Sequence, residues 1–512
     1  MKLALAFARP SAILWLMILL AGVIHLTSAR WHIRYGGFNT DEGFYAIATR
    51  AVAQGEMPYR DFGFTQTPLV LYANALPLQL AGFGLFSQRA INGLWGAIAL
   101  ALAATWLARR TRPGWALAFA GLFSLSAPWM YFIHLGKTYG FTTLLVTVAS
   151  WAFLAMDRGP RRNFVLGILA VLGVGTRLPA APFFGMLWLL GLWPGGRPTV
   201  RETVAAFAGV VATALVVILP FWLSAPEAVL FWIFDFHRES VPLKDWHVAW
   251  TDIASLAPAV WVLAAAGIFA AIRQHCWAAP ETGVILAALV TLAANLLPGG
   301  AYQEYGVPFL LPLAMASVAL VYDGFSAEKK IGAAALAGVV LAAHFFTGPL
   351  LLSNEAAVRC GTLSQWLPPH APAYNRELPA QLDAARQVVE RSLAPIAPFI
   401  GPNLILAAET GRFVPRVLRM GPFSFTVEIP PERAARLHLA THEQLDAWFA
   451  DPSVTVLGFF RRHQLNYAWS MPSFDQLRPE FHAQWFAPVF RDFVTAYASG
   501  EFLILVRKNP RP

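Results

Sequence analysis

The run VAAFAGVVATALVVILPFWL, residues 204–223, contains no charged side chain. Such a run is typical of a membrane-spanning helix, because about 20 apolar residues cross the hydrocarbon core and only a helix satisfies its own backbone hydrogen bonds there. A second apolar run of similar length occupies residues 331–352. We therefore predict a mostly α-helical, polytopic membrane protein.

Composition supports this prediction and argues against a nucleic-acid-binding protein. Of the 512 residues, 57% are hydrophobic and only 13% are charged, about half the charged fraction of a typical soluble domain. The formal net charge is +9, but residues 353–512 hold 16 basic and 14 acidic residues. Most of the positive charge thus lies in short loops of the apolar part, as expected of a topology signal. No basic stripe with interleaved aromatic residues indicates a nucleic-acid partner.

The distribution of Lys and Arg predicts a topology with a cytoplasmic N-terminus. The apolar run Leu69–Phe86 is predicted to be an interfacial or re-entrant helix, because a span there would place Arg109, Arg110 and Arg112 outside. Residues 30–90 then form the first external loop. The expected spans number about eleven: Ser11–Ala29, Ile91–Ala108, Trp115–Ile133, Phe141–Met156, a pair of short helices within Phe164–Trp193, Val204–Leu223, one ending near Arg273, Gly283–Leu297, Tyr305–Tyr322 and Ile331–Leu352.

After residue 352 the composition becomes that of a soluble protein. We therefore predict a transmembrane domain over residues 1–352 and a small extracytoplasmic α/β domain over residues 353–512, large enough for its own core. The expected elements of the second domain are an amphipathic helix, a helix opened by a capping box at Thr441, and three strands. The helix is Glu377–Leu393, and the strands are Asn403–Ala408, Val454–Phe460 and Glu501–Arg507.

The candidate site residues lie in loops on the predicted external face. Asn39–Pro68 reads NTDEGFYAIATRAVAQGEMPYRDFGFTQTP, a dense polar loop between two apolar segments. A carboxylate there can take a proton from an attacking hydroxyl, while cations hold a phosphate leaving group. The candidates are Asp41 and Glu42 as catalytic residues, with Tyr45, Arg60, Asp61, Gln66, His134, Lys137, Arg177, Arg238 and Glu304 as substrate-binding residues.

Each of these assignments has a structural alternative. Asp41 and Glu42 could simply cap the helix that follows them. The neighbouring Arg60 and Asp61 could form only a local salt bridge, and Arg177 could reach a membrane interface without binding substrate. His134 and the other external histidines lack metal-ligand spacing. No cofactor is indicated, and a role for a divalent metal stays open.

The motifs DEGFYA (residues 41–46), GEMPYRDF (55–62) and TQTP (65–68), followed by an apolar run, resemble the first external loop of GT-C glycosyltransferases. The resemblance is greatest to the bacterial branch related to protein O-mannosyltransferases and aminoarabinose transferases. It implies inverting transfer of a sugar from a polyprenyl-phosphate-linked donor to a hydroxyl of a glycan, lipid or protein. The expected location is the bacterial inner membrane, with the C-terminal domain in the periplasm.

The resemblance also implies residue roles. The first acidic residue of the pair is the general base in that family, which corresponds to Asp41, and Glu42 would orient the base or the acceptor. The sequence departs from the family at Gln66, where many relatives have lysine, and at Lys137, where many have an acid. We therefore expect the charges of the two loops to be exchanged, with Lys137, assisted by Arg60 or Arg177, holding the phosphate.

Two other classes of function remain as alternatives. One is a transporter or flippase for a lipid or oligosaccharide, which typically shows inverted repeats and charges at mid-membrane. The other is a scaffold whose external domain binds a partner, with a purely structural acidic loop. The clustering of charge at one face favours the enzyme.

Overall fold

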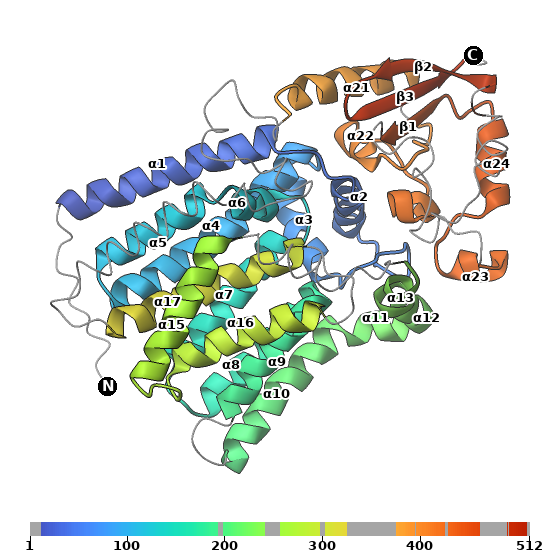
Figure 1. Ribbon diagram of the computed structural model, residues 1–512. Coiled ribbons are helices and arrows are strands. Elements are labelled where there is room, and N and C mark those ends of the chain that lie inside the picture. The colour runs from blue at the N-terminus through green and yellow to red at the C-terminus, as the bar shows by residue number, and fades with distance from the viewer. Residues whose placement is uncertain are drawn as a thin grey trace.

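The computed structural model describes residues 12–192, 198–240, 257–296, 303–324, 375–394, 396–424, 429–460, 489 and 491–508. The predicted last span, 331–352, and the predicted domain boundary at 352 lie outside these residues. The described residues form a helical bundle with a smaller domain at one end, where the three strands also lie (Figure 1).

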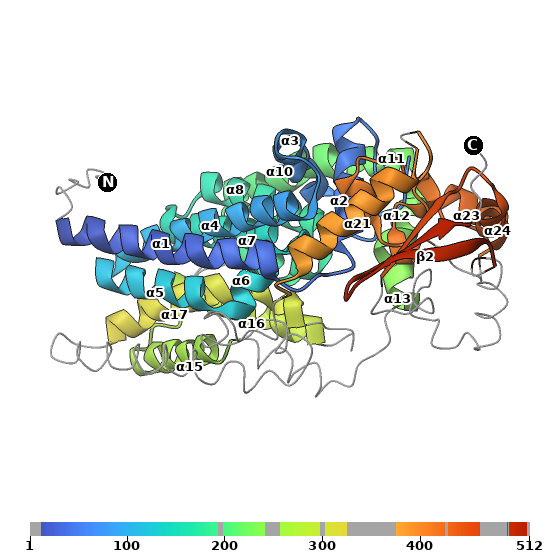
Figure 2. The same ribbon diagram turned by 90° about the horizontal axis from the view of Figure 1, so that it is seen from above.

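The bundle consists of long apolar helices packed around one hydrophobic core. Figure 2 shows α1, α4 and α5 side by side along its length. The bundle helices are α1 (Ala12–Tyr35), α4 (Leu85–Arg110), α5 (Pro113–Leu125), α6 (Ala127–His134), α7 (Tyr139–Ala155), α8 (Pro160–Thr176), α9 (Ala181–Leu192), α10 (Val200–Val217), α15 (Pro258–Arg273), α16 (Pro280–Leu296) and α17 (Val307–Gly324).

By length and composition, fewer helices could cross a membrane than the sequence predicts. Within the described residues three qualify, namely α4, α10 and residues 304–324, which include α17. The bent pair of α5 and residues 128–134 of α6, which meet at 71°, would be a fourth. Prolines account for several of the shorter pieces: Pro128 stands in the first turn of α6, and Pro220 in that of α11 (Leu219–Ser224). The count of about eleven spans therefore stays a prediction.

The run predicted to lie in the interface forms a separate short helix, α3 (Leu69–Ala81). Thirteen residues span about 20 Å, less than the hydrocarbon core of a bilayer. Its apolar side chains Leu76 and Leu80 are strongly exposed. Both features agree with an interfacial position, which remains a prediction.

The smaller domain contains a three-stranded antiparallel sheet of order β1-β3-β2, formed by β1 (Val456–Phe460), β2 (Phe493–Ala498) and β3 (Phe502–Arg507). The predicted amphipathic helix is confirmed as α21 (Leu378–Ser392), and the predicted capping box at Thr441 opens α24 (His442–Ala450). The strand predicted over Asn403–Ala408 is wrong, because this segment forms helix α22 (Leu404–Glu409). A buried run of six apolar residues does not by itself distinguish a strand from a helix.

The smaller domain shares its hydrophobic core with the first loop of the chain. This second core includes residues of α2 (Glu42–Ala53), of the segment 221–236 and of all three strands. Helices α2 and α22 pack so closely at Gly43 that a Cβ there would lie 2.6 Å from the Ile405 backbone nitrogen. Arg50 of α2 also donates hydrogen bonds to the carbonyl oxygens of Ala407 and Arg412. The expectation of a core of its own is therefore corrected to a shared core, which holds the acidic loop in place.

Candidate active site

Asp41 and Lys137 form an ion pair at the junction between the first loop and the bundle. Asp41 stands immediately before α2, and its side chain forms no hydrogen bond to the first turn of that helix. Oδ2 of Asp41 instead lies 2.8 Å from Nζ of Lys137, in the turn between α6 and α7. Helix capping therefore does not explain the Asp41 side chain, which is directed at the second polar loop.

Lys137 also faces a second carboxylate. Its Nζ lies 3.9 Å from Oε1 of Glu304, in the short helix η3 (Gln303–Gly306) that precedes α17. The Lys137 side chain is only 9% exposed. Burial alone would lower the pKa of Lys137, but Asp41, Tyr139 and Glu304 together outweigh burial and raise this pKa well above the ordinary lysine value. Lys137 is therefore a permanent cation between two acids, and three predicted site residues come together here.

Arg177 provides a second buried cation beside Lys137. It stands, with extended backbone, where α8 ends and the short helix η1 (Leu178–Ala180) begins. Its guanidinium carbon lies 4.6 Å from the ring centre of Tyr139 and 4.5 Å from that of Tyr305. Nη1 donates to the Thr138 hydroxyl at 2.8 Å, and among the described residues Nε has no partner. A buried guanidinium with an unused donor suits an anionic ligand.

Tyr45 lies one turn along α2 from Asp41 and is buried. Burial raises the pKa of its hydroxyl well above the ordinary tyrosine value, against the opposing influence of Lys137 and Arg177. The phenol therefore remains neutral, and it lies within the electrostatic reach of Asp41, Lys137 and Arg177.

Glu42 is completely buried and forms part of a network that joins the loop to the bundle. Its two carboxylate oxygens accept hydrogen bonds from Arg89 of α4 at 2.8 and 2.6 Å. Oε1 also accepts from the backbone N–H of Gly136 at 2.9 Å. Because Gly136 precedes Lys137 and Glu42 follows Asp41, this network sets the relative positions of the two partners in the ion pair.

Arg60 and Asp61 form the local salt bridge that the alternative interpretation describes. Their Nη2 and Oδ2 atoms lie 2.6 Å apart, and the Arg60 side chain is 49% exposed. The backbone oxygen of adjacent Tyr59 contacts His438 of the smaller domain at 3.1 Å. Gln66, in the same loop, accepts a hydrogen bond from the Tyr59 hydroxyl through its backbone oxygen. These contacts stabilise the loop, and none of them joins Arg60 or Gln66 to the Lys137 cluster.

His134 and Arg238 have contacts with residues other than Asp41 and Lys137. Nδ1 of His134 lies 2.6 Å from the Met130 carbonyl oxygen, and its ring stacks on that of His32. The Arg238 side chain is 76% exposed, and its Nη2 lies 3.5 Å from Oδ1 of Asp235.

Three residues of the site were not predicted. Arg89, Thr138 and Tyr139 hold Glu42 and Arg177 in place. Arg89 lies between the predicted apolar segments Leu69–Phe86 and Ile91–Ala108, so the hydropathy pattern did not indicate a role for it. Within the described residues, no group of three or more His, Cys, Asp or Glu side chains could hold a metal ion.

Comparison with solved structures identifies the fold. The structure superposes on ArnT from Cupriavidus metallidurans in the apo state with a TM-score of 0.62 and 15% sequence identity, covering 96% of this chain and 97% of that chain. ArnT bound to undecaprenyl phosphate gives a TM-score of 0.60 and 14% identity, covering 97% and 98%.

The chain has the fold of ArnT. The expected resemblance to the aminoarabinose transferase branch is thus confirmed at the level of fold, as is the mostly helical fold class. No protein-family model matches the sequence, and no curated protein matches it.

Proposed function

We propose that this protein is an inverting GT-C glycosyltransferase that transfers a sugar from a polyprenyl-phosphate donor to a hydroxyl acceptor. The observation that carries the proposal is the ion pair of Asp41 and Lys137, with Nζ 2.8 Å from Oδ2. A base for the acceptor and a cation for the departing phosphate lie side by side. The fold shared with ArnT, one structure of which contains undecaprenyl phosphate, supports a lipid-phosphate donor.

Asp41 acts as the general base in the proposed reaction. The acceptor oxygen attacks the anomeric carbon as its proton passes to the Asp41 carboxylate, and the bond from that carbon to the phosphate oxygen breaks. The donor enters as a phosphodiester with one negative charge and leaves as a phosphomonoester with two. Protonation of Asp41 offsets the added charge, so the total charge of the site is unchanged.

Lys137 and Arg177 stabilise the leaving phosphate. An ammonium group has three donors, so Lys137 can keep its contact with Asp41 or Glu304 while binding a phosphate oxygen. The unused Nε–H of Arg177 supplies a second donor from a fixed position between Tyr139 and Tyr305. Buried cations aimed at developing charge are the usual source of electrostatic stabilisation in a transition state.

The other candidates have supporting roles in this proposal. Glu42 positions Asp41 and the turn that carries Lys137. Glu304 and Tyr45 surround the two cations and orient the acceptor or donor. Arg60, Gln66, His134 and Arg238 take no direct part. We place the site on the periplasmic face of the bacterial inner membrane, where the smaller domain presents a glycan, lipid or protein acceptor.

The test is a transfer assay with the full chain reconstituted in vesicles that contain a polyprenyl-phosphate sugar. The proposal predicts release of polyprenyl phosphate that depends on an added hydroxyl acceptor, with inverted configuration in the product by NMR. Movement of the intact donor between leaflets without cleavage would instead support a transporter.

A further inference from the structure

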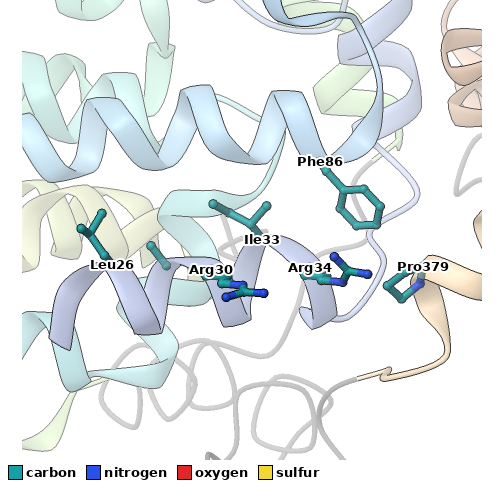
Figure 3. Close-up of a pocket in the computed structure, with 7 residues that line it drawn as sticks. Leu26, Arg30, Ile33, Arg34, Phe86 and Pro379 are labelled. Atoms are coloured by element: carbon teal, nitrogen blue, oxygen red, sulfur yellow. The ribbon is translucent and has the colours of Figure 1, made fainter. Parts of the chain in front are cut away.

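A groove of about 470 Å³ opens on the outer side of the bundle, at the C-terminal end of α1. Figure 3 shows the guanidinium of Arg34 between Phe86 and Pro379, with Arg30 one turn back on α1. The groove is lined by Leu26, Ala29, Arg30, Ile33, Arg34, Phe86 and Pro379. These residues come from α1, α4 and α21, and none belongs to the Asp41–Lys137 cluster. The groove is therefore a separate site.

The polar end of the groove is positively charged. Arg30 and Arg34 are four residues apart and so lie on one face of α1. Arg376, at the start of the smaller domain, does not line the groove, and its guanidinium carbon lies 5.5 Å from the ring centre of Trp31 on α1. Among the described residues no ion pair joins Arg30, Arg34 or Arg376 to a carboxylate, and the nearby Glu377 accepts a hydrogen bond from Gln381. Two arginines without acidic partners match a phosphate group.

The apolar end continues from the groove along α1. Leu19, Val23 and Leu26 are 63%, 52% and 69% exposed, and their spacing places them in line with Arg30. An exposed apolar stripe on a helix of a membrane protein faces hydrocarbon. The stripe therefore leads from the bilayer to the arginines, as an acyl chain leads to its headgroup.

We propose that this groove binds one anionic phospholipid of the bilayer, with the phosphate on Arg30 and Arg34 and an acyl chain along the Leu19–Leu26 stripe. On the topology proposed above, these arginines face outward, against the usual bias of basic residues toward the cytoplasm. Retention of an acidic lipid explains that exception. The lipid would also fix the end of α1 against α21, where the Asn375 N–H donates to the Tyr35 carbonyl oxygen.

The experiment measures lipid binding, so its outcome is independent of whether the protein transfers sugar. The full chain in detergent is titrated with phosphatidylglycerol and, separately, with phosphatidylcholine of the same acyl chains, and bound lipids are counted by native mass spectrometry. The wild type is expected to bind one phosphatidylglycerol about ten-fold more tightly than phosphatidylcholine. The double variant Arg30→Gln, Arg34→Gln is expected to lose this preference.

The matched control is Arg109→Gln, Arg112→Gln, which removes two exposed arginines at the other end of α4 and is expected to keep the preference. Equal binding of the two lipids, or an unchanged preference in the Arg30→Gln, Arg34→Gln variant, would overturn the proposal. Displacement of phosphatidylglycerol by equimolar polyprenyl phosphate would overturn the choice of occupant.

Discussion

Lys137 contacts Asp41 at 2.8 Å while Gly136, its neighbour in the chain, donates to Glu42, the neighbour of Asp41. Two adjacent acids in one loop are therefore joined to two adjacent residues in another. The two acids differ in accessibility. Asp41 is partly exposed and can reach a substrate, whereas Glu42 is buried in an ion pair with Arg89.

Removal of the Lys137 charge should weaken donor binding. In Lys137→Met, Asp41 and Glu304 lose the cation between them, and the phosphate keeps only Arg177 of its two proposed cationic partners. We expect the KM for the polyprenyl-phosphate sugar to rise at least ten-fold. The measurement is steady-state kinetics with varied donor. An unchanged donor KM with intact folding would remove Lys137 from the site.

Replacement of Arg177 by lysine should not be conservative. An ammonium group cannot stack between the Tyr139 and Tyr305 rings or present the same fork of donors. We expect Arg177→Lys to lose about ten-fold or more in kcat/KM for the donor. Arg60→Lys, at the exposed salt bridge, serves as the control and should keep wild-type kinetics. Equal effects of the two substitutions would contradict the assigned roles.

Substitution of Glu42 should affect stability as much as activity. Glu42→Gln leaves the buried guanidinium of Arg89 without a counter-charge, a change that typically costs roughly 3–5 kcal/mol. The measurement is thermal unfolding in detergent. Arg60→Gln, which breaks the exposed pair with Asp61, should hardly change the unfolding temperature. A stable Glu42→Gln variant would show that the network does not hold the loop.

Contact between α2 and α22 should tolerate no added methyl group. Gly43→Ala would place a carbon 2.6 Å from the Ile405 nitrogen, and overpacking of this kind costs about 1–3 kcal/mol. Gly185→Ala in α9 is the matched control, because nothing lies within 4 Å of a Cβ there. It should be neutral or slightly stabilising. Equal unfolding temperatures for the two variants would contradict the shared core.

The site should keep its charge over a wide pH range. Because the folded pKa of Lys137 is raised, its ion-pair contribution to stability is fully present from neutral pH up to the ordinary lysine pKa of about 10.4, and it is lost as the pH rises from there through the raised pKa of the folded protein. The pKa of Tyr45 is also raised, so its phenol stays neutral over the same range. We expect no loss of donor affinity between pH 7 and 10. A decrease with a midpoint below pH 10 that disappears in Lys137→Arg would contradict this expectation.

Some of these features followed from the sequence and others could not. The capping box at Thr441 and the pair of short helices within Phe164–Trp193 depend on local residues, and both predictions are confirmed. The strand prediction for Asn403–Ala408 is wrong. The helix found there packs closely against α2, and this long-range contact cannot be read from the local pattern.

In the candidate site, too, some contacts were expected from the sequence and others were not. The grouping of Asp41 with Lys137 and Glu304 was expected from their common side of the membrane. The partner of Glu42 was not expected, because Arg89 lies at the start of an apolar run and only folding brings it beside the loop.

The most direct test of the account is the turnover number of Asp41→Asn beside Asp61→Asn in reconstituted membranes that contain a polyprenyl-phosphate sugar. Loss of the general base should lower kcat for transfer by about a hundred-fold or more, with donor binding retained through Lys137. Asp61→Asn should remain close to wild type, because Asp61 contacts Arg60 and the Met57 N–H rather than the Lys137 cluster. Full activity of a folded Asp41→Asn variant would contradict the central claim.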